Sequence, residues 1–294
     1  MNTNYSLPKV AAWCAVIFCS LLPEILMDAA GIAIPAWWAW IQILLALTML
    51  SVSMRVKSFA PLQVFFLFLV LYLLLWRGVT VIRHLPVWQQ WESSTVWVAG
   101  ISAIQGLKMG IALLLLVGLF FILRRRQVFF FTSGSASNPA QPVSWLGMKT
   151  ASTWKRFGLI IALFFFLGGI AFLWLSNQPT IGMIAKTLPL LPFIILISAT
   201  NAFSEEVMFR SALLAPLETA IARSSALAII SVFFGLAHYS GSFPSGLVWV
   251  LLTGFLGFLF GKAMLETRGL GTSWFLHFIS DIPVFFFTAV FSIQ

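Results

Sequence analysis

The sequence predicts an all-α polytopic membrane protein with about nine transmembrane helices. Hydrophobic residues make up 61% of the 294 residues and charged residues only 9%, and the mean hydropathy is +1.01. A soluble domain of this length carries far more charge. The second observation is that apolar runs approaching the ~20 residues that a helix needs to cross a bilayer recur along the whole chain.

The apolar runs form two groups separated by a polar stretch. Four precede it, at about 10–30, 36–52, 59–76 and 104–123; five follow it, at about 157–175, from about 187 onward, and at about 225–239, 246–260 and 271–291. The first run lacks a small-residue cleavage site and is too long for a signal peptide, so we expect it to be a retained span.

The polar stretch predicts the division of the chain. Residues 127–156 contain a run rich in Ser, Gly and Pro, which is typical of a flexible linker. We therefore expect an N-terminal transmembrane region of four spans at 1–126, to which no function is assigned. A cytoplasmic linker at 127–156 and a region of five spans at 157–294 follow.

The basic residues predict the orientation. With the N-terminus in the cytoplasm, thirteen of the 17 Lys and Arg residues fall on the inner side and three on the outer side, with Lys108 inside the fourth run. This asymmetry favours a multi-pass protein of the cell (inner) membrane with its C-terminus outside. Because the basic residues lie between apolar runs, the net charge of +9 does not indicate a nucleic-acid partner.

Three charges fall within the sixth run, in the stretch 201–210. Glu205, Glu206 and Arg210 lie within six positions, although the whole chain has only eight acidic residues. An ionised group in hydrocarbon is costly unless it is paired or hydrated, so such residues usually mark a functional site. We expect the helix to continue to Pro216, with Arg210 pointing to the inner water layer and paired with Glu206. Glu205 would then be free for chemistry.

Three further polar residues lie on other C-terminal spans. His238 closes the seventh run, and His277 and Asp281 lie four residues apart in the ninth, hence on one helical face. Two of the three histidines of the chain are in this set. We expect these side chains to meet Glu205 inside a bundle of the C-terminal helices.

This set of side chains suits the attack of water on an amide or ester. A carboxylate such as Glu205 can act as general base, with His238 helping to hold the water. His277 and Asp281 can polarise a carbonyl group and stabilise an oxyanion. The sequence has no Gly-x-Ser-x-Gly elbow and no His-Glu-x-x-His motif. No cofactor is expected, but zinc held by Glu205, His238 and His277 stays open as an alternative.

These residues also resemble a known family. Three ordered motifs are similar to those of the CPBP intramembrane proteases, also called the ABI or CAAX-protease family, which include the type II CAAX prenyl endopeptidases: Glu205-Glu206-x-x-x-Arg210, Phe234-x-x-x-His238 and His277-x-x-x-Asp281. The resemblance covers about residues 189–291, a third of the chain. It implies a glutamate-dependent intramembrane endopeptidase, with the catalytic bundle formed by the C-terminal helices.

The resemblance also implies roles. Glu205 matches the catalytic glutamate, His238 the histidine that helps activate water, and His277 with Asp281 the pair that stabilises the oxyanion. Glu206 and Arg210 match supporting residues. The last motif position is often Asn in the family; an ionised Asp281 cannot donate a hydrogen bond, so it is either protonated or orients His277.

The implied partners are the lipid bilayer and a membrane-associated or lipid-anchored protein or peptide substrate. Neither the substrate nor the oligomeric state is readable from the sequence. Three alternatives stay open: a non-catalytic scaffold of the immunity or secretion type, the zinc metalloprotease, and a proton-coupled transporter, since intramembrane Glu, His and Asp also relay protons.

Overall fold

The computed structural model describes residues 6–124, 129–240 and 246–292. Its α-helices are α1 (Ser6–Cys19), α2 (Leu22–Ala29), α3 (Trp38–Arg55), α4 (Gln63–Arg83), α5 (Pro86–Glu92), α6 (Trp97–Leu123), α7 (Trp154–Asn177), α8 (Ile181–Thr187), α9 (Leu191–Glu205), α10 (Ala215–Ala220), α11 (Arg223–Leu236), α12 (Leu247–Thr267) and α13 (Leu270–Ser292). Short 3₁₀ segments are η2 (Lys57–Leu62), η4 (Ser144–Leu146) and η5 (Leu188–Leu190), and η6 (Glu206–Leu214) is a π-helix. The strands β1 (Pro139–Ala140) and β2 (Ser152–Thr153) form one antiparallel pair.

The all-α polytopic class is confirmed, but the count of nine spans is not. In the described part of the chain, seven helices are long and apolar enough to cross a membrane. The pair α1 and α2, bent by 48°, gives an eighth if it forms one span. The remaining predicted segment corresponds to α11, which has 14 residues. That length falls short of the ~20 residues that a straight crossing needs.

Large apolar side chains cover the outside of the bundle. On α7, exposed residues include Leu159, Leu163, Phe164 and Leu167. Exposed apolar surface on this scale is unfavourable in water and normal against lipid. The exterior therefore agrees with a multi-pass integral membrane protein.

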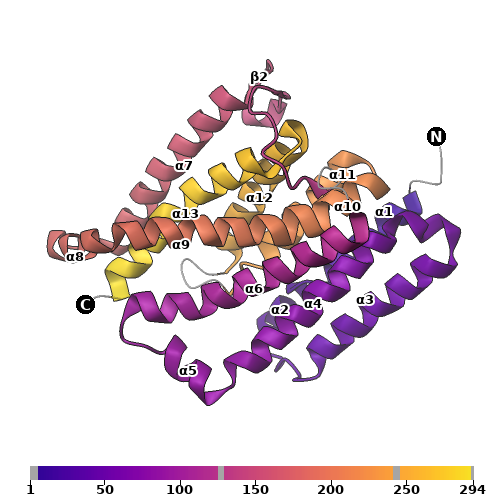
Figure 1. Ribbon diagram of the computed structural model, residues 1–294, viewed down its shortest axis with the longest axis horizontal. Coiled ribbons are helices and arrows are strands. Elements are labelled where there is room, and N and C mark those ends of the chain that lie inside the picture. The colour runs from indigo at the N-terminus through magenta and orange to yellow at the C-terminus, as the bar shows by residue number, and fades with distance from the viewer. Residues whose placement is uncertain (1–5, 125–128, 241–245, 293–294) are drawn as a thin grey trace.

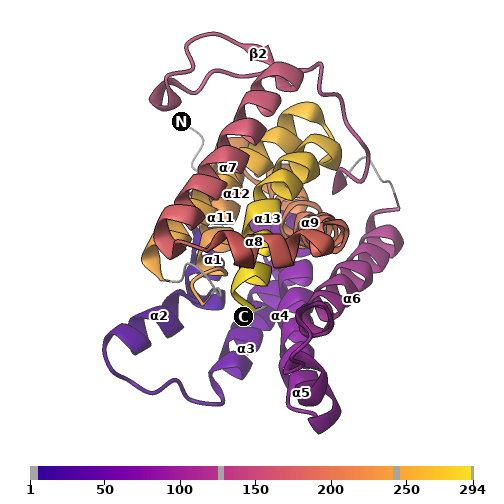
Figure 2. The same ribbon diagram turned by 90° about the vertical axis from the view of Figure 1, so that its left-hand side faces the viewer.

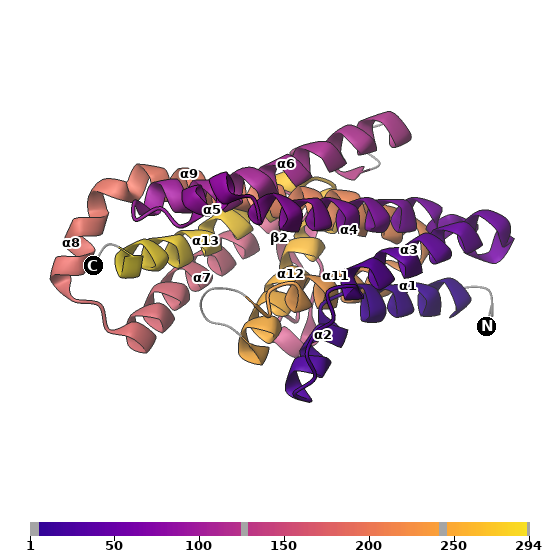
Figure 3. The ribbon, with the colours of Figure 1, turned by 90° about the horizontal axis from the view of Figure 1, so that it is seen from below.

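The long helices lie in a layered bundle. Figure 1 shows α3, α4, α6 and α9 side by side, in an order that their packing contacts confirm. Helix α13 packs against α7, α9 and α12, and it lies inside this group when the molecule is seen from its end (Figure 2). Helices α1 and α8 lie toward opposite ends of the bundle (Figure 3).

One apolar core joins the two groups of spans. The ring of Tyr72 on α4 lies 5.7 Å from the rings of both Phe209 and Phe233, measured between centroids. All three side chains are buried. The N-terminal helices therefore pack directly on the helices that carry the predicted site.

The predicted linker lies against the turn between α12 and α13. The Ser135 amide donates to the Thr267 carbonyl oxygen at 2.8 Å, and the Leu270 amide donates to the Thr132 carbonyl oxygen at 2.9 Å. The backbones approach so closely that a Cβ added at Gly269 would lie 2.2 Å from the nitrogen of Gly134. The division of the chain at residues 127–156 stays a prediction.

Candidate active site

The sixth predicted span continues past its charged motif, as expected. The helical stretch runs from Ile181 to Ala220 without a break long enough to end it. It extends four residues beyond Pro216, the predicted end, and ends at Ala220. The extension keeps Glu205 and Glu206 inside the bundle rather than at a helix end.

The π-helical turn starts at the motif itself. Helix α9 ends at Glu205 and η6 begins at Glu206. At the other end of η6 the Ala215 amide donates to the carbonyl oxygen of Arg210, five residues earlier. Isolated π-helical turns inside α-helices occur frequently at functional sites.

Glu206 is fully engaged by protein groups. Its Oε1 accepts a hydrogen bond from Nδ1 of His277 at 2.9 Å, and its Oε2 accepts one from the Ser273 hydroxyl. Arg210 Nε lies 3.5 Å from Oε1, four residues along the helix. The expected pair of Glu206 with Arg210 is present, and the Glu206 side chain is fully buried.

Arg210 does not point to the inner water layer, so that expectation is wrong. Its side chain is only 1% exposed. The guanidinium lies 4.3 Å from the centroid of the Phe234 ring and 5.5 Å from that of Phe260. A cation held over aromatic rings in this way is stabilised without water.

Glu205 is not free of partners, which corrects the second part of that expectation. Its Oε1 accepts a hydrogen bond from the ammonium group of Lys108 on α6. Its Oε2 lies 3.4 Å from Nε2 of His238 and 3.5 Å from Nε2 of His277. One carboxylate oxygen is therefore held by a cation, while the other faces two imidazoles.

Both imidazoles have their Nδ1 atoms occupied. In His238 this atom lies 2.7 Å from the carbonyl oxygen of Phe234, which can only accept, so Nδ1 carries a proton. In His277 it donates to Glu206. A neutral ring then presents an unprotonated Nε2 to Glu205. Two acceptors in contact require a proton or a bridging water between them, which is the arrangement that a general base uses.

Asp281 completes the cluster at one side. Its Oδ2 accepts a hydrogen bond from Nδ2 of Asn201 at 2.8 Å, and its Oδ1 lies 3.7 Å from Nε2 of His277. The predicted residues Glu205, His238, His277 and Asp281 are thus brought together.

Sequence reasoning missed three members of the cluster. Ser273 donates to Glu206. Lys108 donates to Asn201 and to Glu205. Asn201 in turn donates to Asp281. Asn201 lies four residues before Glu205, on the same helical face, which was an available signal. The contact of Lys108 crosses from one group of spans to the other, and spacing along the chain does not reveal such a contact.

The cluster borders a cavity of about 270 Å³ between α6, α9, α11, α12 and α13. Its polar lining includes Lys108, Asn201, Glu205, His238, His277 and Asp281. Its apolar lining includes Ile101, Ile104, Trp249, Leu256, Val284 and Phe285. The cavity therefore combines polar groups that converge on Glu205 with an apolar part of its wall, as binding sites commonly do.

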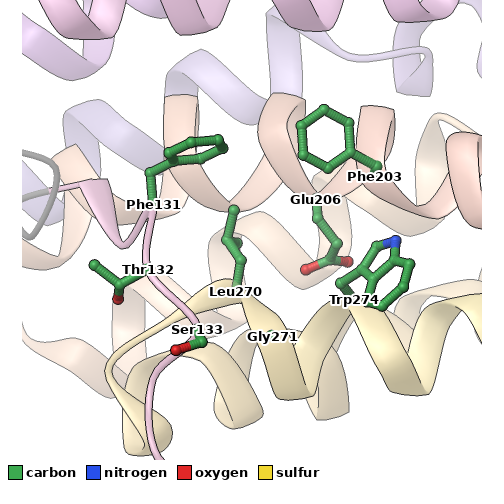
Figure 4. Close-up of a pocket in the computed structure, with 8 residues that line it drawn as sticks. All are labelled: Phe131, Thr132, Ser133, Phe203, Glu206, Leu270, Gly271 and Trp274. Carbon is green, nitrogen blue, oxygen red and sulfur yellow. The ribbon is translucent and has the colours of Figure 1, made fainter.

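A second cavity lies on the other side of the glutamate pair. It has a volume of about 310 Å³ and is lined by Phe131, Thr132, Ser133, Phe203, Glu206, Leu270, Gly271 and Trp274. Figure 4 shows Glu206 reaching from its helix toward Trp274 on α13. Because Glu206 is held by three groups, this cavity offers no unengaged carboxylate.

Close contact between α11 and α12 sets the position of His238. A Cβ added at Gly235 would lie 2.6 Å from the carbonyl oxygen of Val250 and 3.0 Å from Cα of Gly254. One at Gly257 would lie 2.9 Å from the Phe234 ring. Small residues at these positions let the two helices approach, as is common between helices in membranes.

The zinc alternative, which would use Glu205, His238 and His277, stays a prediction. Across residues 6–124, 129–240 and 246–292, no group of three or more His, Cys, Asp or Glu side chains has a geometry that could hold a metal ion. The carboxylate and imidazoles of the cluster instead contact one another and Lys108.

The fold and the cluster define a polytopic membrane protein with a buried site of carboxylates and imidazoles. Residues 187–283 match the family model described as type II CAAX prenyl endopeptidase Rce1-like. The match contains the three motifs and confirms that the C-terminal part of the chain resembles the CPBP family, a family of proteases. No curated protein and no solved structure matches the chain.

Proposed function

We propose that this protein is an intramembrane endopeptidase that hydrolyses a peptide bond of a membrane-associated or lipid-anchored protein. One observation carries the proposal. Glu205 Oε2 faces the Nε2 atoms of His238 and His277 at 3.4 and 3.5 Å, beside a cavity of about 270 Å³. The match to a prenyl endopeptidase family supports the reaction class and the membrane-bound substrate.

In the proposed first step a water molecule lies between Glu205 and His238. Glu205 takes a proton from this water as the oxygen attacks the carbonyl carbon of the peptide bond. The C–O bond forms and the carbonyl oxygen becomes an oxyanion. His277, already held by Glu206, donates from Nε2 to that oxyanion when its ring is protonated.

In the second step the tetrahedral intermediate collapses. The carbonyl group re-forms and the C–N bond breaks, while the proton held by Glu205 passes to the leaving nitrogen, so that a carboxylic acid and an amine are released. The acid then passes the second proton of the attacking water to the amine, which gives a carboxylate and an ammonium group. Asp281 orients the His277 ring from 3.7 Å. The route uses side chains alone, and we propose that no metal ion takes part.

A comparison of peptide termini tests the proposal for any substrate in the membrane. Wild type and Glu205→Gln are expressed at equal membrane abundance, and new peptide termini of membrane proteins are mapped by mass spectrometry. Glu92→Gln is the matched control, because Glu92 pairs with Arg83, a partly exposed residue outside the site. We expect termini that depend on wild type, persist with Glu92→Gln and disappear with Glu205→Gln.

A metal chelator separates the alternatives. Termini that survive the chelator support water activated by Glu205, whereas their loss would overturn the metal-independent route in favour of the zinc metalloprotease. If Glu205→Gln retains all cellular function, the protein is a binding or scaffolding protein and the proposal fails.

A further inference from the structure

The most unusual group in the site comes from outside the three motifs. Lys108 lies on α6, in the N-terminal group of spans, and its ammonium group donates to Glu205 Oε1 and to Oδ1 of Asn201. Its side chain is 16% exposed and lines the cavity. An ionised lysine inside an apolar bundle is energetically unfavourable unless a specific partner binds it, and such residues are usually functional.

Asn201 extends the contact of Lys108 to Asp281. The amide group of Asn201 accepts from Lys108 through Oδ1 and donates to Asp281 through Nδ2 at 2.8 Å. Lys108, Asn201 and Asp281 therefore form one hydrogen-bonded chain that begins at Glu205. A change at position 281 therefore alters a hydrogen bond of Asn201, which also binds Lys108, the residue that holds Glu205.

The formal charges explain why a lysine is present. The cluster holds three carboxylates, those of Glu205, Glu206 and Asp281, against two permanent cations, Lys108 and Arg210. With neutral imidazoles the formal charge of the cluster is −1. Removing Lys108 makes it −2, whereas replacing Asp281 by Asn in the same variant returns it to −1.

We propose that Lys108 is a positioning residue that balances the negative charge of Asp281. Its bond to Oε1 fixes the carboxylate of Glu205, so that Oε2 faces His238 and His277. This inference rests on the proposed peptidase function for its kinetic consequences. The charge coupling itself is a property of the folded protein and is measurable without a substrate.

The removal of Lys108 leaves two acceptors without their donor, Oε1 of Glu205 and Oδ1 of Asn201. Glu205 is only 4% exposed, so water does not readily replace the ammonium group. The carboxylate then turns toward another donor or takes up a proton. Either change removes the general base from its position.

The experiment is a double-mutant cycle on the full-length protein in detergent, with Lys108→Met, Asp281→Asn and the double variant. Thermal unfolding is the first readout. We expect the double variant to unfold at a higher temperature than Lys108→Met alone, because the excess negative charge is gone. Additive effects of the two changes would overturn the charge coupling. Lys186→Met, an exposed lysine on α8, is the control for loss of a positive charge.

The second readout is cleavage of a farnesylated peptide in proteoliposomes. We expect Lys108→Met to lower kcat at least 30-fold, with KM changed less than threefold, and Lys108→Arg to retain more activity than Lys108→Met. Asp281→Asn in the Lys108→Met background should raise kcat again. Wild-type kcat in Lys108→Met would overturn the positioning role.

The two readouts separate the inference from the proposed function. If the stability cycle shows coupling but the comparison of peptide termini finds no cleavage that depends on Glu205, the peptidase proposal fails and the charge pairing stands. If wild type cleaves the peptide and the cycle is additive, the peptidase stands and the charge pairing fails.

Discussion

At the scale of single residues, two adjacent glutamates differ in what surrounds them. Glu206 is saturated by His277, Ser273 and Arg210, so it holds the site together. Glu205 has one oxygen held by Lys108 and one that faces two imidazoles. The two glutamates are similarly buried, so the difference between their roles follows from their different partners.

The supporting role of Glu206 and Arg210 predicts a loss of stability. Arg210→Met should lower the free energy of unfolding by about 3–5 kcal/mol, because it leaves the Glu206 charge buried without its cation. Arg223→Met is the control: its pair with Glu218 spans 4.0 Å and the arginine is half exposed, so the loss should be below about 1 kcal/mol. Both are measured by reversible denaturant unfolding of the detergent-solubilised protein. Equal stability of the two variants would contradict the supporting role.

Much of the cluster was predictable residue by residue. Charged and imidazole side chains are rare in apolar spans, so Glu205, His238, His277 and Asp281 were conspicuous before any geometry was known. Lys108 was not, because a lysine in a span can also extend toward the interface. Only the packing of α6 on α9 shows that its ammonium group turns to Glu205.

At the scale of helices, the site depends on the continuous helical stretch Ile181–Ala220 and on the close contact between α11 and α12. The continuation of the sixth span past Arg210 was predictable, because Pro216 was the expected stop after the charged motif. The π-helical turn η6 was not, because its widened hydrogen-bond pattern has no clear sequence signal. The glycines of α11 and α12 were visible in the sequence, but their pairing was not.

The close contact of α11 with α12 predicts the effect of one added methyl group. Gly235→Ala should push the helices apart, since its Cβ would lie 2.6 Å from the Val250 carbonyl oxygen. His238, three residues later, should move and cleavage should fall on the order of 10- to 100-fold. Gly168→Ala on α7, where an added Cβ meets nothing within 4 Å, is the control. Rates are compared per folded molecule in proteoliposomes, and unchanged cleavage in Gly235→Ala would rule out this positioning.

At the scale of the whole molecule, the class of fold followed from composition, whereas the number of spans did not. The apolar runs of the sequence located these segments, but α11 has too few residues for a straight crossing, and α1 with α2 is bent. The N-terminal helices had no predicted role. In the structure, α4 shares the core around Phe209 and α6 supplies Lys108, so the proposed site is built from both groups of spans.

The central claim is that water, activated by Glu205, attacks the substrate directly. The most direct measurement is a single turnover in H₂¹⁸O, with mass analysis of both the peptide product and the enzyme. Direct attack places ¹⁸O in the new carboxylate of the product and none in the side chain of Glu205. An ¹⁸O label in Glu205, or a covalent peptide adduct on the enzyme, would show that a side chain attacks first and would contradict the claim.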